Sequence, residues 1–169
     1  MQLSIILTTK YRLLSLAAIV DVFETANRFL LEDGKTQLFE ITLVGIPPDK
    51  ALPESISHLP YTTFTAERQY DLILIPAFGP VDLARTVEEN SCFIPWLRDQ
   101  YNGGATLASN CTGAFLLAAS GLLNGKRATT HVDAVDKLAT YFPKVDIRQD
   151  AVVTQDTNIY TSGGATSGF

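Results

Sequence analysis

The sequence predicts a doubly wound α/β domain, a three-layer sandwich in which a mostly parallel sheet is flanked by helices. Segments of strand length alternate with segments of helical periodicity along the chain, which is the pattern of such folds. Residues 70–76 form a mainly apolar run bounded by turn residues, as a parallel strand buried on both faces does. The length of 169 residues suits one hydrophobic core, so we expect a single domain.

The elements follow in order from local patterns. Leu16, Val20 and Phe23 recur at helical spacing, which predicts the first helix. Residues 112–119 are apolar almost all round, which predicts a buried helix. We expect strands at residues 3–8, 39–44, 70–76, 104–109, 152–154 and 159–161, and helices at residues 13–31, 81–89, 94–101, 112–119 and 132–141.

Composition narrows the classes of function. Lys plus Arg is 13 and Asp plus Glu is 18, which gives a net charge of −5. An acidic domain without a basic cluster is a poor nucleic-acid binder, because phosphate contacts need lysine and arginine. The two cysteines, Cys92 and Cys111, and the two histidines, His58 and His131, show no close ligand spacing. We therefore expect no metal and no other cofactor.

The start of the chain and its hydropathy bear on location. The first seven residues lack a basic leader and a long apolar stretch, so they predict a strand and not a signal peptide. No apolar run approaches the roughly 20 residues that span a bilayer. We therefore expect a cytoplasmic protein without a membrane partner.

Cys111 stands between a predicted strand and a predicted helix. Ser109 and Gly113 flank it at minus two and plus two, where a nucleophile elbow needs small residues because the turn is tight. A thiol at a helix N-terminus is expected to favour the thiolate. The N–H of Thr112 would face a developing oxyanion, and the loop at residues 76–79 could supply a second donor. The alternative is that Cys111 is a small buried core residue.

The segment around this cysteine resembles a known family. Residues 110–131, NCTGAFLLAASGLLNGKRATTH, resemble the signature of the DJ-1/PfpI superfamily, a class I glutamine amidotransferase-like group. The resemblance is to the amidase-like branch that forms the N-terminal half of AraC-family transcriptional regulators, and residues 15–28 and 159–165 resemble it as well. It implies a flavodoxin-like fold over residues 1–169, a homodimer, and a small-molecule effector or substrate.

The resemblance also implies roles for individual residues. Cys111 would be the nucleophile or sensor thiol, Asp21 its acid partner, and His131 a base or a group that orients a ligand. From the residues alone, Asp21 could instead lie on the surface of an amphipathic helix. His131 could instead cap the helix that starts near Val132, or satisfy a hydrogen bond in the core. We expect the elbow and the loop at residues 76–79 to supply the ligand-binding residues, which are Ala77, Phe78, Gly79, Asn110, Thr112 and Gly113.

Two positions depart from the family pattern. Ala77-Phe78-Gly79 stands where the superfamily often has Gly-Gly, so a side chain can fill the pocket. Thr112 stands where PfpI-type peptidases have histidine, which argues against peptidase or amidotransferase chemistry.

Three classes of function remain open at this point. The first is the ligand-sensing and dimerisation domain of an AraC-family regulator, which contacts DNA only through a C-terminal helix-turn-helix domain absent from this chain. The second is a stand-alone cysteine-dependent enzyme, either isonitrile hydratase-like or an amide hydrolase. The third is a structural dimerisation domain with a vestigial pocket. The sequence ends on a glycine turn where family members continue into a last helix, so we expect the gene to encode more.

Overall fold

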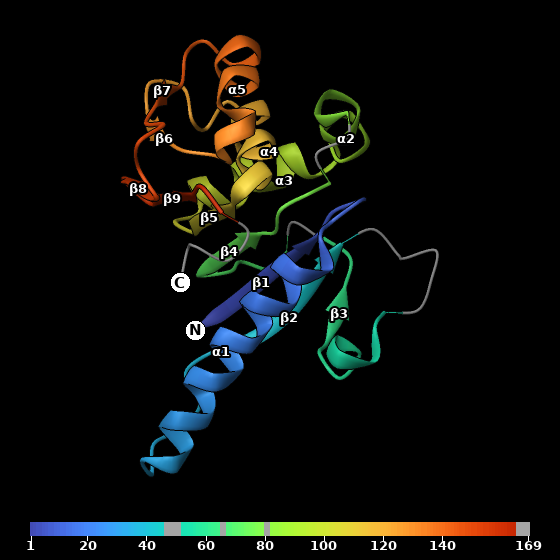
Figure 1. The fold of residues 1–169 in the computed structure, drawn as a ribbon. Helices are drawn as coiled ribbons and strands as arrows, with labels where there is room; N and C mark the ends of the chain where they lie inside the picture. Colours follow the sequence, from blue (N-terminus) through green and yellow to red (C-terminus); the bar gives the residue numbers. More distant parts are fainter. Residues whose placement is uncertain (46–51, 65–66, 80–81, 165–169) are drawn as a thin grey trace.

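The fold is built on a seven-stranded sheet (Figure 1). The computed structural model describes residues 1–45, 52–64, 67–79 and 82–164. Neighbouring strands are parallel throughout the sheet except for the antiparallel pair at one edge, β9 and β8. The order across the sheet is β3 (Tyr61–Thr62), β2 (Glu40–Gly45), β1 (Gln2–Leu7), β4 (Leu72–Ile75), β5 (Thr106–Asn110), β9 (Ile159–Ser162) and β8 (Val153–Asp156).

Helices connect these strands, and two of the described helices follow directly on a 3-10 turn. The α-helices are α1 (Leu13–Glu32), α2 (Leu83–Glu89), α3 (Phe93–Asn102), α4 (Ala114–Ala119) and α5 (Val135–Tyr141). The 3-10 turns are η1 (Glu54–Ile56), η2 (Cys111–Gly113) and η3 (Val132–Ala134). A separate parallel pair consists of β6 (Arg127–Ala128) and β7 (Asp146–Ile147).

The sheet separates two hydrophobic cores, one on each face. Leu16 and Ile19 of α1 pack against β1 and β2 on one face. On the other face, Ile73 of β4 packs among side chains of α3, α4 and α5, including Phe115 and Leu138. Figure 1 shows the same division, with α1 alone on one side and α3, α4 and α5 grouped on the other. The central strands are therefore apolar on both faces, which explains the continuous apolar run in β4.

The chain reverses its direction of progress across the sheet between β1 and β4. From β1 it moves outward to β2 and β3, and then returns to form β4 on the opposite side of β1. The loops that leave these two adjacent strands therefore diverge at their carboxyl ends. In open α/β sheets this is the place where ligands bind.

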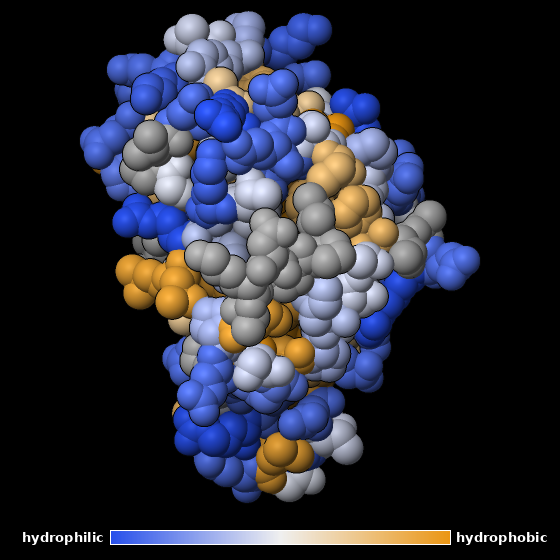
Figure 2. Space-filling view, turned by 90° about the vertical axis from the view of Figure 1, so that its right-hand side faces the viewer, coloured by the Kyte–Doolittle hydropathy of each residue, from blue (hydrophilic) through white to orange (hydrophobic). Residues whose placement is uncertain are grey.

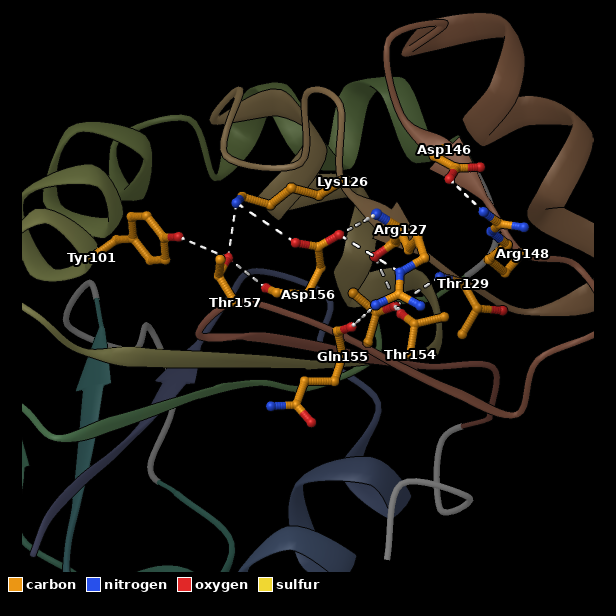
Figure 3. A network of polar contacts seen from close by, with 11 residues as sticks. Tyr101, Lys126, Arg127, Thr129, Asp146, Arg148, Thr154, Gln155, Asp156 and Thr157 are labelled. Atoms are coloured by element: carbon orange, nitrogen blue, oxygen red, sulfur yellow. Dashed lines mark hydrogen bonds and ion pairs between the residues drawn. The ribbon is translucent and has the colours of Figure 1, made fainter.

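A network of polar contacts joins the β6–β7 pair to the β8–β9 edge (Figure 3). The Arg127 backbone N–H donates to Asp156 Oδ2 at 3.1 Å, and its guanidinium donates to the Gln155 carbonyl at 3.1 Å. Deeper in the structure, the Thr129 N–H donates to Thr161 Oγ1 at 2.7 Å. These contacts fix the segment that leads from β6 towards His131.

The predicted fold class is confirmed: the sheet is mostly parallel and helices flank both faces. Each predicted strand and helix also has a counterpart, apart from positions 80 and 81, which lie outside the described residues. The sequence analysis missed β3, β6 and β7. Each of these strands has two residues, and a hydrophobic period cannot be recognised over two residues.

The surface is mixed in character. Figure 2 shows hydrophobic residues in separate patches among hydrophilic ones on the face that it presents. Leu14 and Phe29 on α1 are among the exposed apolar side chains, at 65% and 57%. Among the residues that the structure describes, no helix combines the length and the hydropathy needed to cross a bilayer.

Candidate functional site

Cys111 lies where β5 ends and the turn η2 begins. Its backbone has φ of 54°, in the left-handed region that side chains other than glycine rarely adopt. Holding a non-glycine residue there costs about 1–2 kcal/mol, which the surrounding contacts must offset. The side chain is 3% exposed. The chain thus turns sharply at this cysteine, between a buried strand and a buried helix.

Gly113 allows this turn to pack against the neighbouring strand. A Cβ at this position would lie 2.7 Å from the Ile75 carbonyl oxygen and 2.9 Å from that of Pro76. Both contacts are with backbone atoms, which cannot rotate away. Any residue larger than glycine would therefore push the turn away from the end of β4.

Thr112 ties the turn to the loop that follows β4. Its hydroxyl accepts a hydrogen bond from the Phe78 N–H at 2.9 Å and donates one to the Phe78 carbonyl at 3.0 Å. On the other side, the Thr130 hydroxyl donates to the Cys111 carbonyl at 2.9 Å. Both contacts are buried, so the position of the cysteine is fixed from two directions.

The loop after β4 does not offer the second oxyanion donor that the sequence suggested. The Ala77 N–H donates to Ser15 Oγ at 3.1 Å, and the Phe78 N–H donates to the Thr112 hydroxyl. The Gly79 N–H donates to the Lys10 carbonyl at 3.0 Å. Since all three N–H groups are engaged, none of them is available to a developing oxyanion.

A pocket of about 190 Å³ opens above Cys111. It lies at the carboxyl ends of β1, β4 and β5, beside the reversal of strand order described above. Its size suits a small metabolite, because pockets for drug-sized ligands start near ~300 Å³. The lining residues are Arg12, Phe78, Leu83, Cys111, Thr112, His131, Asp133, Ala134 and Lys137.

Burial raises the pKa of the Cys111 thiol above its ordinary value of 9.0. Hydrogen bonding by Thr112 and the positive charge of Arg12 offset part of this effect. The thiol is therefore mostly protonated at neutral pH. The expectation that the position at the helix end would favour the thiolate is wrong for the thiol as a whole, because desolvation raises its pKa by more than Thr112 and Arg12 lower it.

His131 lines the pocket and also caps η3. Its Nδ1 accepts a hydrogen bond from the Asp133 N–H at 3.2 Å, and the Asp133 carboxylate lies 3.6 Å from the same nitrogen. The side chain is 41% exposed. The capping role and the position at the pocket, which the sequence left as alternatives for His131, are thus compatible. In the neutral ring Nε2 carries the proton, since Nδ1 accepts.

Asp21 lies on the exposed face of α1 and does not line the pocket. Leu16 and Val20 face the sheet. Because successive residues of an α-helix are rotated by ~100° about the helix axis, the side chain after Val20, that of Asp21, points towards solvent. The α1 residue that does reach the site is Ser15, through its bond to the Ala77 N–H. The structure therefore gives Asp21 no contact with the thiol.

The remaining predicted residues separate into two groups. Phe78 and Thr112 line the pocket, whereas Ala77, Gly79 and Gly113 support it from behind. Asn110 faces away from the pocket. It lines an apolar groove of about 290 Å³ on the α1 side of the sheet, where Ser162 Oγ donates to its Oδ1 at 3.3 Å.

Sequence analysis missed Arg12 and Lys137 at the pocket. Arg12 lies in the loop after β1, at the carboxyl end of a central strand, where sites form in this fold class. Lys137 carried no signal, because only the packing of α5 brings it to the pocket. Among the described residues, no three His, Cys, Asp or Glu side chains gather as metal ligands.

A larger groove, of about 580 Å³, lies at the opposite end of the sheet. It is lined by residues near the amino ends of strands, such as Glu40 and Arg68, and by the second half of α1. It contains no nucleophile and lies away from the carboxyl ends of the strands, where sites form in this fold class. The smaller pocket over Cys111 is therefore the candidate site.

These features define an α/β protein with a cysteine-centred pocket at the carboxyl edge of a parallel sheet. The model of the DJ-1/PfpI family matches residues 44–169, and the chain belongs to this family.

Three relatives illustrate the range of this family. The chain is 35% identical over 96 residues to the HTH-type transcriptional regulator CdhR of Pseudomonas aeruginosa, covering 57% of this chain and 27% of the regulator. It is 38% identical over 110 residues to an isonitrile hydratase of Pseudomonas putida, covering 65% of this chain and 46% of the hydratase. The chain thus spans less than half the length of either. The crystal structure of Drosophila melanogaster DJ-1beta matches with a TM-score of 0.75 and 22% identity, over 98% of this chain and 83% of that one.

Proposed function

We propose that this domain is the ligand-sensing and dimerisation part of an AraC-type transcriptional regulator, acting in the cytoplasm. A small molecule binds in the pocket over Cys111. DNA is contacted by a helix-turn-helix domain outside the residues given. The similarity to the regulator CdhR supports this assignment, and the net charge of −5 fits a domain that leaves DNA contact to another part of the protein.

The observation that carries the proposal is the state of the thiol. Cys111 faces a pocket of small-molecule size, but burial raises the pKa of its thiol and keeps it neutral. Among the described residues no carboxylate acts on that pKa, and Asp21 is remote. A neutral thiol suits contact with a ligand better than attack on it, because the thiolate is the nucleophile.

Ligand binding acts by selecting one arrangement of the elements around the pocket. The pocket is lined from the loops after β1 and β4, from η2 and from α5. A ligand that contacts several of these elements stabilises one relative position of them. In a homodimer this shifts the geometry of the DNA-binding halves, and the coupling is reciprocal between ligand and DNA.

The second candidate is a cysteine-dependent enzyme, favoured by the similarity to isonitrile hydratase and by His131 at the pocket. In that reaction water adds to the isonitrile carbon and yields an N-substituted formamide. The Cys111 sulfur would add to that carbon while its proton moves through His131 to the same carbon, which gives a thioimidate. Water would then add to the thioimidate carbon, and cleavage of the C–S bond would release the formamide and return the thiol. The raised pKa of Cys111 disfavours the thiolate, which is the nucleophile in this chemistry.

Two measurements separate the candidates. The full-length gene product is titrated with its promoter DNA, with and without a panel of small metabolites. For a regulator, one of these metabolites is expected to change the affinity for DNA by at least about fivefold.

In the second measurement, the same protein is incubated with cyclohexyl isocyanide, and N-cyclohexylformamide is measured for the wild type and for Cys111→Ser. Formamide production that depends on Cys111, with no effect of ligands on DNA binding, would replace the sensing role with the enzymatic one.

A further inference from the structure

The pocket over Cys111 is positively charged in an acidic protein. Arg12 and Lys137 line it, and Asp133 is the one carboxylate among its lining residues. The Asp133 side chain is 86% exposed, so water screens its charge. The chain as a whole carries a net charge of −5. The pocket therefore concentrates charge of the opposite sign to that of the whole chain.

The two cations in the pocket lack the partners that other cations of this protein have. Within the described ranges, most lysine and arginine side chains bind a carboxylate, a carbonyl or another polar group, as Lys10 does with Glu89 at 3.0 Å. Arg12 and Lys137 have no such hydrogen bond or ion pair, and neither has Lys144, which lies outside the pocket. Two of the three cations that lack a partner in the described part of the chain thus line the same small pocket.

Local structure holds both cations at the pocket. The Arg12 N–H donates to the Ala77 carbonyl at 2.7 Å, and Tyr11 pairs with Phe78 in an isolated antiparallel bridge. Lys137 lies on α5, which follows the turn that His131 caps. The backbones that carry the two cations are therefore fixed, whereas the ends of the side chains are free to meet a ligand.

We infer that the ligand of this pocket is a small molecule with an anionic head, a carboxylate, and a short apolar body. The inference rests on the proposed small-molecule site and names the chemistry of its ligand. Arg12 and Lys137 bind the carboxylate, since a guanidinium and an ammonium both donate to carboxylate oxygens.

The other walls of the pocket suit the apolar body. Phe78, Leu83 and Ala134 line it and are all at least 95% buried. The thiol of Cys111 adds no negative charge, because burial keeps it protonated. The carboxylate therefore meets two cations and no buried anion, and the body of the ligand meets hydrocarbon.

The test compares two probes with the same four-carbon chain, sodium butyrate and butyramide, which differ in charge. Binding is followed by NMR through the backbone amide signals of Thr112 and Ala134. The variants are Arg12→Gln and Lys137→Gln, with Lys144→Gln as the matched control that removes an unpaired lysine outside the pocket. All three side chains lack partners, so we expect the variants to fold as the wild type does.

We expect butyrate to bind and butyramide to bind at least about tenfold more weakly, since tenfold corresponds to about 1.4 kcal/mol and a hydrogen bond to a charged group contributes at least that much. Arg12→Gln and Lys137→Gln should each weaken butyrate binding by about the same factor, and Lys144→Gln should leave it unchanged. Equal binding of the two probes, or equal effects of the two lysine variants, would overturn the inference but leave the small-molecule site in place. If neither probe shifts either amide signal, both the inference and the proposed site are wrong.

Discussion

The hydrogen bonds between Thr112 and Phe78 allow a quantitative test of how the site is held together. Thr112 is 4% exposed, and its hydroxyl both accepts from the Phe78 N–H and donates to the Phe78 carbonyl. The substitution Thr112→Val keeps the shape of the side chain and removes both bonds. Because each unpaired buried group costs about 1–3 kcal/mol and two groups lose their partner, the free energy of unfolding should fall by about 2–6 kcal/mol.

Thr112→Ser is the matched control. It keeps the hydroxyl and loses one methyl group, which costs about 0.8 kcal/mol in burial. The assay is urea unfolding followed by the fluorescence of Trp96, the single tryptophan, which is 5% exposed. With a slope of about 2 kcal/mol per molar urea, the valine variant should unfold at a midpoint about 1–3 M lower than the wild type.

The comparison of the two variants decides the outcome. If Thr112→Val and Thr112→Ser are equally stable, the hydroxyl does not hold the loop after β4, and the account of the pocket wall fails. If only the valine variant is destabilised and the slope is unchanged, the two hydrogen bonds are the cause.

Four further predictions concern the turn at Cys111 and Gly113 and the segment before β2. Gly113→Ala should lower the free energy of unfolding by at least ~2 kcal/mol, because its Cβ would lie 2.7 and 2.9 Å from two carbonyl oxygens. Gly125→Ala, with φ of 73° and no atom within 4 Å, should cost only about 1 kcal/mol in urea unfolding. Iodoacetamide at neutral pH should label Cys92 before Cys111, because Cys92 is exposed and burial raises the pKa of the Cys111 thiol. Peptide mass spectrometry would show the order of labelling, and faster labelling of Cys111 would contradict this prediction. Since the folded state holds the Cys111 proton more tightly, the free energy of unfolding should fall as the pH rises above 9.0, and Cys111→Ser should lack that component. Asn27→Ala should cost about 2–4 kcal/mol in thermal unfolding, since its side chain binds three backbone groups before β2 at 2.8, 2.9 and 3.1 Å.

Much of the fold could be predicted because its signals are local. The apolar run of β4 and the helical period of α1 appear in consecutive residues, and both elements are found within one or two residues of the prediction. The position of Cys111 was also predictable, since small residues at Ser109 and Gly113 are a local requirement of a tight turn. These features depend on the sizes and spacing of neighbouring residues.

The site could be predicted only in part, because its lining comes from distant segments. Asp21 has apolar neighbours in the sequence, but the direction of its side chain depends on which face of α1 meets the sheet. Arg12 and Lys137 are separated by more than a hundred residues, and only the packing of α5 against the sheet brings both to one pocket. The loop donors were misjudged for the same reason, since their acceptors, such as Ser15 Oγ, lie far away in the chain.

The sequence by itself determined the alternation of strands and helices, the family signature and the turn at Cys111. These follow from steric and hydrophobic preferences that act over a few residues. Only the tertiary structure decided the charge of the pocket and the protonation of the thiol. Both are set by groups brought together from the loops after β1 and β4, from η2 and from α5, and by the exclusion of water around them. The free energy of a charge depends on these surroundings in space.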